Sequence, residues 1–152
     1  MGQDDTKHNL LFISKYPEII HEFTDAMKDR DIEIDTAING IEAAAKIKKK
    51  NYDIVITGLS LEGFNGEQII TYLNKTAPST VCIIYTTTIS SAQLHFFINE
   101  RNVFRVFLRP VDFRGAFWEA LEEAYEYHAV QVKNEEDTGA RRQEQEKQER
   151  EI

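Results

Sequence analysis

Residues 52–66, YDIVITGLSLEGFNG, decide the fold of this chain. They include β-branched apolar residues at positions 54–56 (IVI), a pattern typical of a buried strand. The glycine-containing segment that follows, up to Gly66, predicts a turn into a helix from about Glu67. In an open α/β sheet, ligands bind at the carboxyl ends of the strands. The loop after this strand is therefore the first place to expect a functional site.

Further strand patterns alternate with helical patterns on either side of this segment. Such alternation predicts a parallel sheet with helices on both faces. We expect strands at residues 9–14, 32–37, 54–56, 80–86 and 104–109. We expect helices that begin near residues 17, 41, 67, 91 and 112, the fourth capped by Ser90 or Ser91 and the fifth by Asp112. The prediction is an α/β fold with a doubly wound, five-stranded parallel sheet flanked by five helices.

Composition and charge restrict the classes of partner. A chain of 152 residues with 41% hydrophobic content can bury one core, so one domain plus a tail is expected. The formal net charge of -8, with no basic stripe, disfavours nucleic acid and anionic membranes, because both are polyanions. The sequence has no apolar stretch of membrane-spanning length, and its polar start is not expected to be a signal peptide. Cys82 is the single cysteine and lies in an apolar run, as a small core residue would. No disulfide can form within the chain, which fits a reducing cytosol, so we expect a cytoplasmic protein.

Residues 131–152 differ in character from the predicted domain at residues 9–130. This C-terminal segment is rich in Glu, Gln, Lys and Arg and has almost no apolar residues, so it offers no coiled-coil seam by itself. Two interpretations stay open. The segment is either a charged tail, helical or disordered, or a linker that pairs with a helix of a partner.

Several separate marks across the predicted domain resemble the receiver domain of bacterial response regulators. In that family the third strand ends in the phosphoacceptor aspartate, and the matching position here is Gly58. Two adjacent acidic residues follow the first strand of receivers, whereas this chain has Ser14 and Lys15. Thr86 matches the family's switch hydroxyl, and Arg109, followed by proline, stands where receivers have a lysine before a cis-proline. The resemblance implies a flavodoxin-like (CheY-like) fold and a two-component or phosphorelay pathway.

The substituted positions argue against the chemistry of that family. Phosphorylation of a receiver needs a carboxylate nucleophile and Mg²⁺, a hard cation that takes oxygen ligands. Gly58 has no side-chain oxygen, Ser14 has a neutral hydroxyl, and Lys15 places a cation where the metal would sit. Other hydroxyls close in sequence lack a positioned base and are poor nucleophiles. The chain therefore resembles a degenerate receiver, or pseudo-receiver, that cannot be phosphorylated in the usual way.

We expect a signalling module that acts through protein–protein interaction, either by dimerising or by docking a partner or an output domain. Residues 98–128 resemble receivers whose long final helix leads to an output module. Receivers commonly dimerise through the face formed by the fourth helix, fifth strand and fifth helix. Phe96, Phe104 and Phe107 are the candidate interface residues on that face.

The two cations of the altered site suggest a second hypothesis. With Lys15 and Arg109 pointing into the cleft, and with Ser14, Thr57 and Thr86 around them, the site would be a cationic hollow lined by hydroxyls. Such a hollow suits phosphate or a phosphorylated metabolite, with Lys15, Arg109 and Thr86 as the binding residues. The competing interpretation is that Lys15 turns to solvent or pairs with Glu62, and that Arg109 fills the space of the lost acids.

Other chemistry finds little support in the sequence. The four histidines are scattered without ligand spacing, so we expect no metal site, and we predict no cofactor. Phosphate-binding loops, dinucleotide fingerprints and Ser-His-Asp patterns are missing from the sequence as well, so we do not expect an enzyme.

Overall fold

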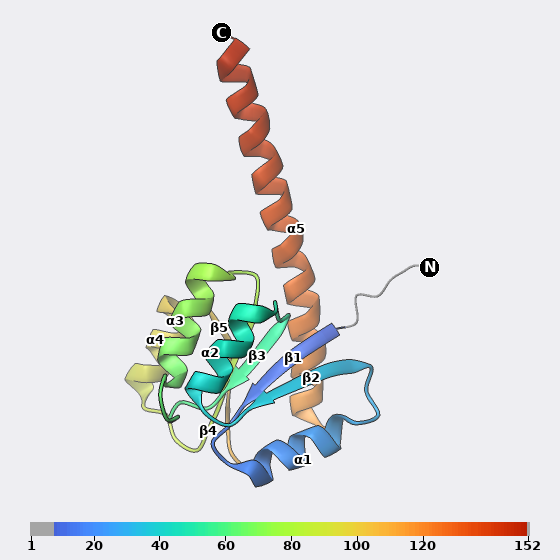
Figure 1. Ribbon diagram of the computed structural model, residues 1–152, viewed down its shortest axis with the longest axis vertical. Coiled ribbons are helices and arrows are strands. Elements are labelled where there is room, and N and C mark those ends of the chain that lie inside the picture. The colour runs from blue at the N-terminus through green and yellow to red at the C-terminus, as the bar shows by residue number, and fades with distance from the viewer. Residues whose placement is uncertain (1–7, 152) are drawn as a thin grey trace.

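The computed structural model describes the backbone of residues 8–151 and the side chains of residues 8–137. Its strands form one parallel sheet in the order β2-β1-β3-β4-β5 (Figure 1). The strands are β1 (His8–Ile13), β2 (Ile32–Ala37), β3 (Ile54–Thr57), β4 (Val81–Thr86) and β5 (Val103–Leu108). Each lies within two residues of its predicted bounds. The predicted doubly wound, flavodoxin-like fold is therefore confirmed.

In the described residues, four helices connect the strands, a fifth follows β5, and together they cover both faces of the sheet (Figure 1). They are α1 (Pro17–Met27), α2 (Gly40–Lys49), α3 (Gly66–Thr76), α4 (Ser91–Glu100) and α5 (Ala116–Glu151). Buried side chains of α1 and α5 join one apolar cluster, and those of α2, α3 and α4 join the other. The sheet thus separates two cores.

The alternation of side chains along β1 explains this division. Leu10 and Phe12 belong to the core under α1 and α5, whereas Leu11 and Ile13 belong to the opposite core. All four are at most 1% exposed, because a central parallel strand is covered on both faces. Cys82 on β4 is also fully buried, and burial raises its pKa to about 12, as expected of an inert core thiol.

Side-chain caps fix where three of the helices begin. Asn39 accepts a hydrogen bond from the Glu42 backbone N–H and starts α2. Asn65 and Ser90 form capping boxes at the starts of α3 and α4, each with a glutamine three residues later. Of the two serines predicted to cap the fourth helix, Ser90 is the one that does so.

The last helix begins later than predicted. Asp112 does not cap it: the Asp112 carboxylate accepts from the Arg114 backbone N–H in a turn, and α5 starts at Ala116. Gly115 in that turn is a poor helix former, which favours the later start. From there the α5 backbone is helical through Glu151 and runs beyond the sheet (Figure 1). The division into residues 9–130 and 131–152 stays a prediction. Within the described part of the chain, no helix is both long and apolar enough to cross a membrane.

Candidate functional site

Residues at the carboxyl ends of four strands meet in one cleft. Ser14 and Lys15 follow β1, Gly58 follows β3, Thr86 ends β4, and Arg109 follows β5. The four strands are parallel and adjacent in the sheet, so their ends lie side by side. All five residues line the same pocket. The structure thus brings together the five positions that the sequence predicted to form the altered phosphorylation site.

Backbone hydrogen bonds position these residues just past the strand ends. The N–H of Ser14 donates to the Ala37 carbonyl at 3.1 Å, and the N–H of Gly58 donates to the Ile13 carbonyl at 3.1 Å. The N–H of Arg109 donates to the Thr86 carbonyl at 2.8 Å. The hydrogen-bond pattern of the sheet therefore continues past the strand ends and fixes the backbone of these three residues in the cleft. The Arg109–Pro110 peptide is cis, as the family resemblance implies.

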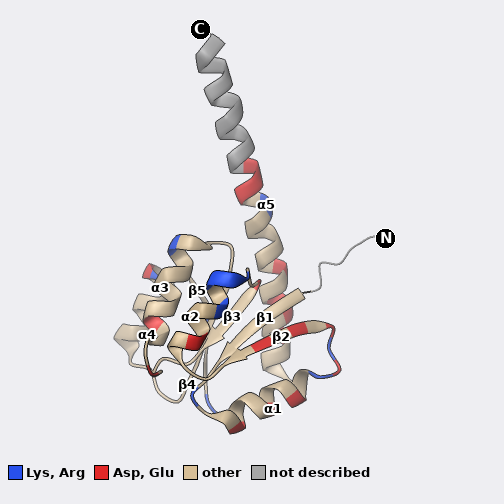
Figure 2. Cartoon of the chain, viewed as in Figure 1, with Lys and Arg blue, Asp and Glu red and all other residues tan. Residues whose placement is uncertain are grey.

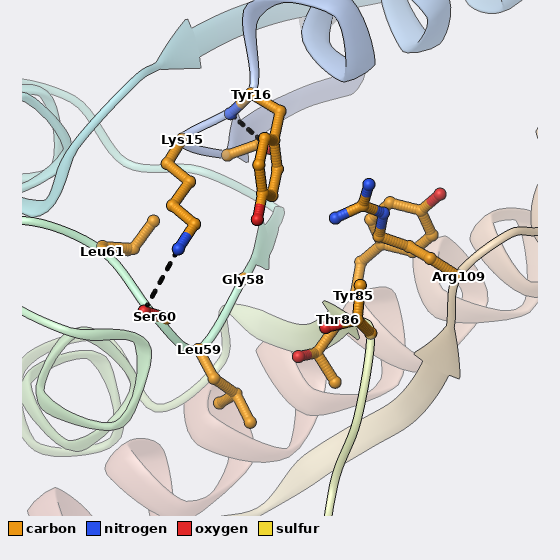
Figure 3. A pocket seen from close by; sticks show the side chains of 11 residues that line it. Lys15, Tyr16, Gly58, Leu59, Ser60, Leu61, Tyr85, Thr86 and Arg109 are labelled. Atoms are coloured by element: carbon orange, nitrogen blue, oxygen red, sulfur yellow. Dashed lines mark hydrogen bonds between the residues drawn. The ribbon is translucent and has the colours of Figure 1, made fainter.

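Lys15 crosses the cleft toward the loop after β3. Its Nζ donates a hydrogen bond to Ser60 Oγ at 3.4 Å (Figure 3). The side chain is exposed, and among the described residues it forms no ion pair with Glu62 or any other carboxylate. The ammonium group is therefore held over the pocket without a neutralising partner.

Tyr16 is the cleft residue that the sequence analysis missed. Its ring lies between the two cations, with Lys15 Nζ 5.4 Å and Arg109 Cζ 4.6 Å from the ring centroid (Figure 3). Both cations are thus within the range of a cation–π contact. The Tyr16 backbone N–H donates to Ser14 Oγ at 3.2 Å, which ties this residue to the end of β1. Its position directly after Lys15 could have indicated that Tyr16 lies near the cleft. The contact of its ring with Arg109 depends on the fold and could not be predicted from that position.

The pocket is small and carries positive charge. Its cavity volume is about 60 Å³, enough for a few water molecules or a small anion. It is lined by Ser14, Lys15, Tyr16, Gly58, Leu59, Ser60, Leu61, Tyr85, Thr86, Thr87 and Arg109. None of these described lining residues is Asp or Glu. Burial raises the pKa of Tyr85, and the nearby Arg109 cation opposes that rise.

Gly58 leaves space at the end of β3. A Cβ atom built there would meet only carbonyl oxygens, that of Tyr85 at 3.7 Å and that of Ile13 at 4.0 Å. These are ordinary van der Waals distances, so the backbone would accept a side chain. Gly66 differs, because a Cβ there would lie 2.2 Å from the Gly58 carbonyl oxygen. The close approach of α3 to the loop therefore requires glycine at position 66 but not at position 58.

Thr57 does not line the cleft, so the prediction that its hydroxyl lies around Lys15 and Arg109 was wrong. It is fully buried, and its hydroxyl donates to the Gly58 carbonyl at 2.8 Å. As the last residue of β3 it points to the face opposite that of the next residue, because side chains alternate along a strand. Ser60, on the loop, supplies the corresponding hydroxyl instead.

The predicted interface residues lie on α4 and β5 but are only partly exposed. Phe96 packs against Phe97, Phe104 lies 5.1 Å from the Tyr127 ring, and Phe107 lies 4.7 Å from the Phe117 ring. The exposed large apolar residues of these two elements are Leu94, Ile98 and Leu108. The apolar α4–β5 face thus exists, with aliphatic rather than aromatic residues outermost. Its use as an interface stays a prediction.

A second polar cluster lies where the strands begin, which we call the amino edge of the sheet. The cleft lies where the strands end, at the carboxyl edge. His128 Nε2 of α5 is 3.1 Å from Asp53 Oδ1, and His128 Nδ1 is 2.8 Å from the Ser79 carbonyl oxygen. Because both ring nitrogens face acceptors, only the doubly protonated imidazole satisfies both. The Asp53 hydrogen bond raises the pKa of His128, in agreement with this geometry. Tyr125 of the same helix donates to the Asn9 carbonyl at 2.9 Å.

The Asp53 carboxylate is held from several sides. Burial by itself would raise its pKa, but hydrogen bonds from His128 and from the Asn9 backbone N–H outweigh burial and lower it. Asn9 also accepts the Asp53 backbone N–H at 2.7 Å. No local sequence pattern pairs His128 with Asp53, because the two residues lie far apart in the chain. This cluster fixes α5 to the amino ends of β1 and β3.

The chemistry of the cleft is set by the hydroxyls and cations of its described lining residues. Hydroxyls and two cations line it, and no described lining residue offers a carboxylate nucleophile or base. The described residues also contain no His, Cys, Asp or Glu group that could hold a metal ion.

Solved structures with the same fold are receiver domains and related signalling proteins. The signal receiver domain of an HD domain-containing protein from Pseudomonas fluorescens has a TM-score of 0.76 and 19% identity, over 82% of this chain and 98% of that one. A CheY-like receiver from Methanospirillum hungatei gives 0.74 and 18%, over 82% and 99%. The structure titled adenylate cyclase from Rhodopirellula baltica gives 0.79 and 19%, over 88% and 98%. At these identities the likeness shows the fold, and no curated protein matches the chain.

The fold defines the class as a CheY-like, flavodoxin-like α/β domain. The model of the response regulator receiver domain matches residues 11–115, more than half of the chain. The chain therefore belongs to the response regulator receiver domain family.

Proposed function

We propose that this domain is a cytoplasmic, non-enzymatic receiver that is not phosphorylated and acts by protein–protein interaction. The observation that carries the proposal is the lining of the cleft, which contains Gly58 at the end of β3 and, among the described residues, no carboxylate. The position equivalent to the family's phosphoacceptor then has no nucleophile. The altered site belongs to an otherwise intact fold, which supports a role for the surface rather than for chemistry in the cleft.

The metal site is altered together with the nucleophile. Mg²⁺ prefers hard oxygen ligands, commonly carboxylates. Ser14 supplies a buried neutral hydroxyl that already accepts the Tyr16 N–H, and Lys15 holds an ammonium group over the pocket. A cation in that position repels Mg²⁺. Because the nucleophile and the metal site are altered together, we propose a module that acts constitutively, without being switched by phosphorylation.

The proposed interaction uses the α4–β5–α5 face or the extension of α5. Leu94, Ile98 and Leu108 expose apolar surface on the first two of these elements. The helix α5 continues beyond the sheet and would lead to a partner or an output domain (Figure 1). Structural relatives include the receiver of an HD domain-containing protein and a structure titled adenylate cyclase, which supports this arrangement as a proposal. Homodimerisation and docking of a different partner are the two forms it can take.

An amide NMR titration of the whole chain with Mg²⁺ and acetyl phosphate, alone and together, tests the loss of phosphorylation. We expect no shifts at Ser14, Lys15, Gly58, Thr86 and Arg109, and no acyl phosphate by intact-mass spectrometry. The triple variant Ser14→Asp/Lys15→Asp/Gly58→Asp is the positive control, because the backbone at position 58 accepts a side chain. Shifts in the wild-type protein that require Mg²⁺ would overturn the proposal.

Light scattering over a range of concentrations tests the homodimer. We expect a dimer that Leu94→Glu disrupts and that Ile41→Glu, a change at an exposed apolar residue of α2 outside the α4–β5–α5 face, leaves intact. A wild-type chain that stays monomeric at high concentration would exclude homodimerisation through this face and leave a different partner as the occupant.

The second candidate function is sensing of an anion such as phosphate or a phosphorylated metabolite. The observation that favours it is the arrangement of Lys15 and Arg109 on either side of the Tyr16 ring, with no carboxylate in the lining. Thr86 and Ser60 add hydroxyl groups at the same pocket. Saturable shifts with inorganic phosphate in the absence of Mg²⁺ would support it, and silence at the cleft would exclude it.

A further inference from the structure

An apolar groove lies between α2 and α3, on the face of the domain that carries neither α1 nor α5. Its cavity volume is about 270 Å³, several times that of the cleft. It is lined by Ala44, Ile47, Lys48, Phe64, Gln68, Ile69 and Tyr72. Phe64 is 46% exposed and Tyr72 is 39% exposed, although both are aromatic. Exposed aromatic side chains around a hollow are typical of surfaces that bind proteins.

Close contacts join the loop before α3 to the start of α2 at one end of the groove. The Gly40 N–H at the start of α2 donates to the Glu62 carbonyl at 2.9 Å. A Cβ atom at Gly40 would overlap the Phe64 backbone, and one at Gly63 would lie 2.5 Å from the Ile41 side chain. The loop before α3 is therefore pressed against the start of α2. This packing places the Phe64 backbone against the start of α2, where the neighbouring Ile41 side chain is 64% exposed.

The two helices that form the groove, α2 and α3, carry opposite charges at their two ends. Lys48, Lys49 and Lys75 lie in the last turns of α2 and α3. Glu42 and Glu67 lie in the first turns of the same helices. Figure 2 shows the blue ends of α2 and α3 together and the red positions near their other ends.

The three lysines are available to a partner. Lys46 and Lys50 of the same segment are already paired, the first with Glu42 and the second with Glu33 and Asp35. Lys48, Lys49 and Lys75 form no ion pair with any residue whose side chain is described. On a chain with a net charge of -8, this is an unusual concentration of unneutralised positive charge.

We propose that the α2–α3 groove docks an amphipathic helix of a protein partner, with its apolar face against Phe64 and Tyr72 and an acidic end beside Lys48 and Lys75. An apolar groove between two helices can accept the apolar face of an amphipathic helix, whose side chains repeat about one helical turn apart. The charges at the two ends of the groove set the direction of the partner helix and select against basic peptides. The groove lies on the other side of the sheet from α5 and does not depend on the proposed function of the cleft or of the α4–β5 face.

Selection from a displayed library of helical peptides tests the proposal. The library holds peptides of about 15 residues, roughly four helical turns, and the target is the full 152-residue chain. We expect selected peptides to combine apolar residues at helical spacing with Asp or Glu at one end. Amide shifts on binding should centre on Ala44, Phe64, Ile69 and Tyr72.

Variants of the full chain separate this groove from the other surfaces. Tyr72→Glu and, independently, Phe64→Ser should each weaken binding of the selected peptides by about tenfold or more. Lys48→Glu/Lys75→Glu should weaken acidic peptides and favour basic ones. Leu94→Glu on α4 is the matched control and should leave the affinity within about twofold. Dispersed amide spectra of each variant would show that it is folded.

Several outcomes would overturn the proposal. They are selected peptides that are basic, peptides that bind Tyr72→Glu and Phe64→Ser as well as wild type, and peptides lost on Leu94→Glu alone. Concentration-dependent shifts at Ile41, Phe64 and Tyr72 without peptide would assign the groove to a second copy of the chain and also refute it. Because Leu94→Glu tests the α4–β5 face separately, failure of this inference is distinguishable from failure of the proposed function.

Discussion

Both the carboxyl edge and the amino edge of the sheet carry charged side chains, but these side chains are arranged differently. At the carboxyl edge, Lys15 and Arg109 face a small pocket whose described lining includes no carboxylate. At the amino edge, Asp53 pairs with His128, the Asn9 N–H donates to Asp53, and the Ser79 carbonyl accepts from His128. Only the amino edge has its charges balanced within the fold.

This difference separates a structural role from a role in binding. A cluster in which every donor meets an acceptor stabilises the fold, because loss of one partner leaves the other buried and unpaired. Charges held around a hollow without partners add little stability and stay available to a ligand. Stability and ligand binding should therefore respond to substitutions at opposite edges of the sheet.

The largest effect is expected at the amino edge. Asp53→Ala should lower the free energy of unfolding by about 2–3 kcal/mol, because it leaves His128 and the Asn9 N–H without their acceptor. Urea denaturation followed by circular dichroism measures the loss. Asp53→Asn keeps the shape without the charge and should be intermediate. A decrease of less than about 0.5 kcal/mol in the free energy of unfolding on Asp53→Ala would contradict a structural role for this cluster.

Anion binding at the carboxyl edge is the next test. If the cleft binds inorganic phosphate, Arg109→Gln should weaken binding about tenfold, or roughly 1.4 kcal/mol, because one of two facing cations is lost. Amide shift titrations give the affinity. Arg105→Gln is the control, since Arg105 pairs with Glu123 away from the cleft. Equal binding by wild type and Arg109→Gln would place the anion elsewhere.

The pH dependence of stability sharpens the view of the amino edge. The pKa of His128 is raised on folding, so its contribution is complete below its ordinary value of 6.5 and is lost as the pH rises through the folded-state pKa. The pKa of Asp53 is lowered, so its contribution is complete above 3.8 and is lost as the pH falls through the folded-state pKa. The pair therefore stabilises most between these two ordinary values.

His128→Gln measures that contribution. At about pH 5 the variant should be less stable than wild type by roughly 1 kcal/mol, and at about pH 9 the difference should shrink. Urea denaturation at both values gives the comparison, with the exposed His21→Gln as control. A difference that does not change with pH would mean that the imidazolium charge contributes nothing.

The smallest effect on stability is expected from Lys15. Its hydrogen bond to Ser60 is long and exposed, so Lys15→Ala should change the free energy of unfolding by no more than about 0.5 kcal/mol. The same denaturation measurement applies. A loss above about 1 kcal/mol would show that the carboxyl edge also holds the fold together, and would blur the contrast between the two edges.

Most of the fold could be predicted because its signals are local. The apolar run at residues 54–56 and its counterparts place every strand to within two residues. Asn39 and Ser90 mark helix starts through hydrogen bonds that span only three residues. The start of the last helix was missed, because Asp112 can cap a turn as readily as a helix.

The candidate site was predictable in membership but not in arrangement. Parallel strands place the residues after their ends at one edge, so Ser14, Gly58 and Arg109 had to meet. The position of Tyr16 between two cations depends on rotamers and on the distance between separate loops. The prediction for Thr57 was wrong because successive side chains of a strand point to opposite faces of the sheet, so closeness in sequence does not place a side chain in the cleft.

The sequence by itself determined the alternation of strands and helices, the two-sided burial of the sheet, and the residue types at the strand ends. These properties follow from periodicity and from side-chain chemistry at single positions. Only the tertiary structure decided that His128 meets Asp53 and that the α2–α3 groove is open between Phe64 and Tyr72. It also decided that Leu94, rather than Phe96, is outermost on α4. Such contacts join residues far apart in the chain or depend on how packed elements are turned, and no local pattern encodes that geometry.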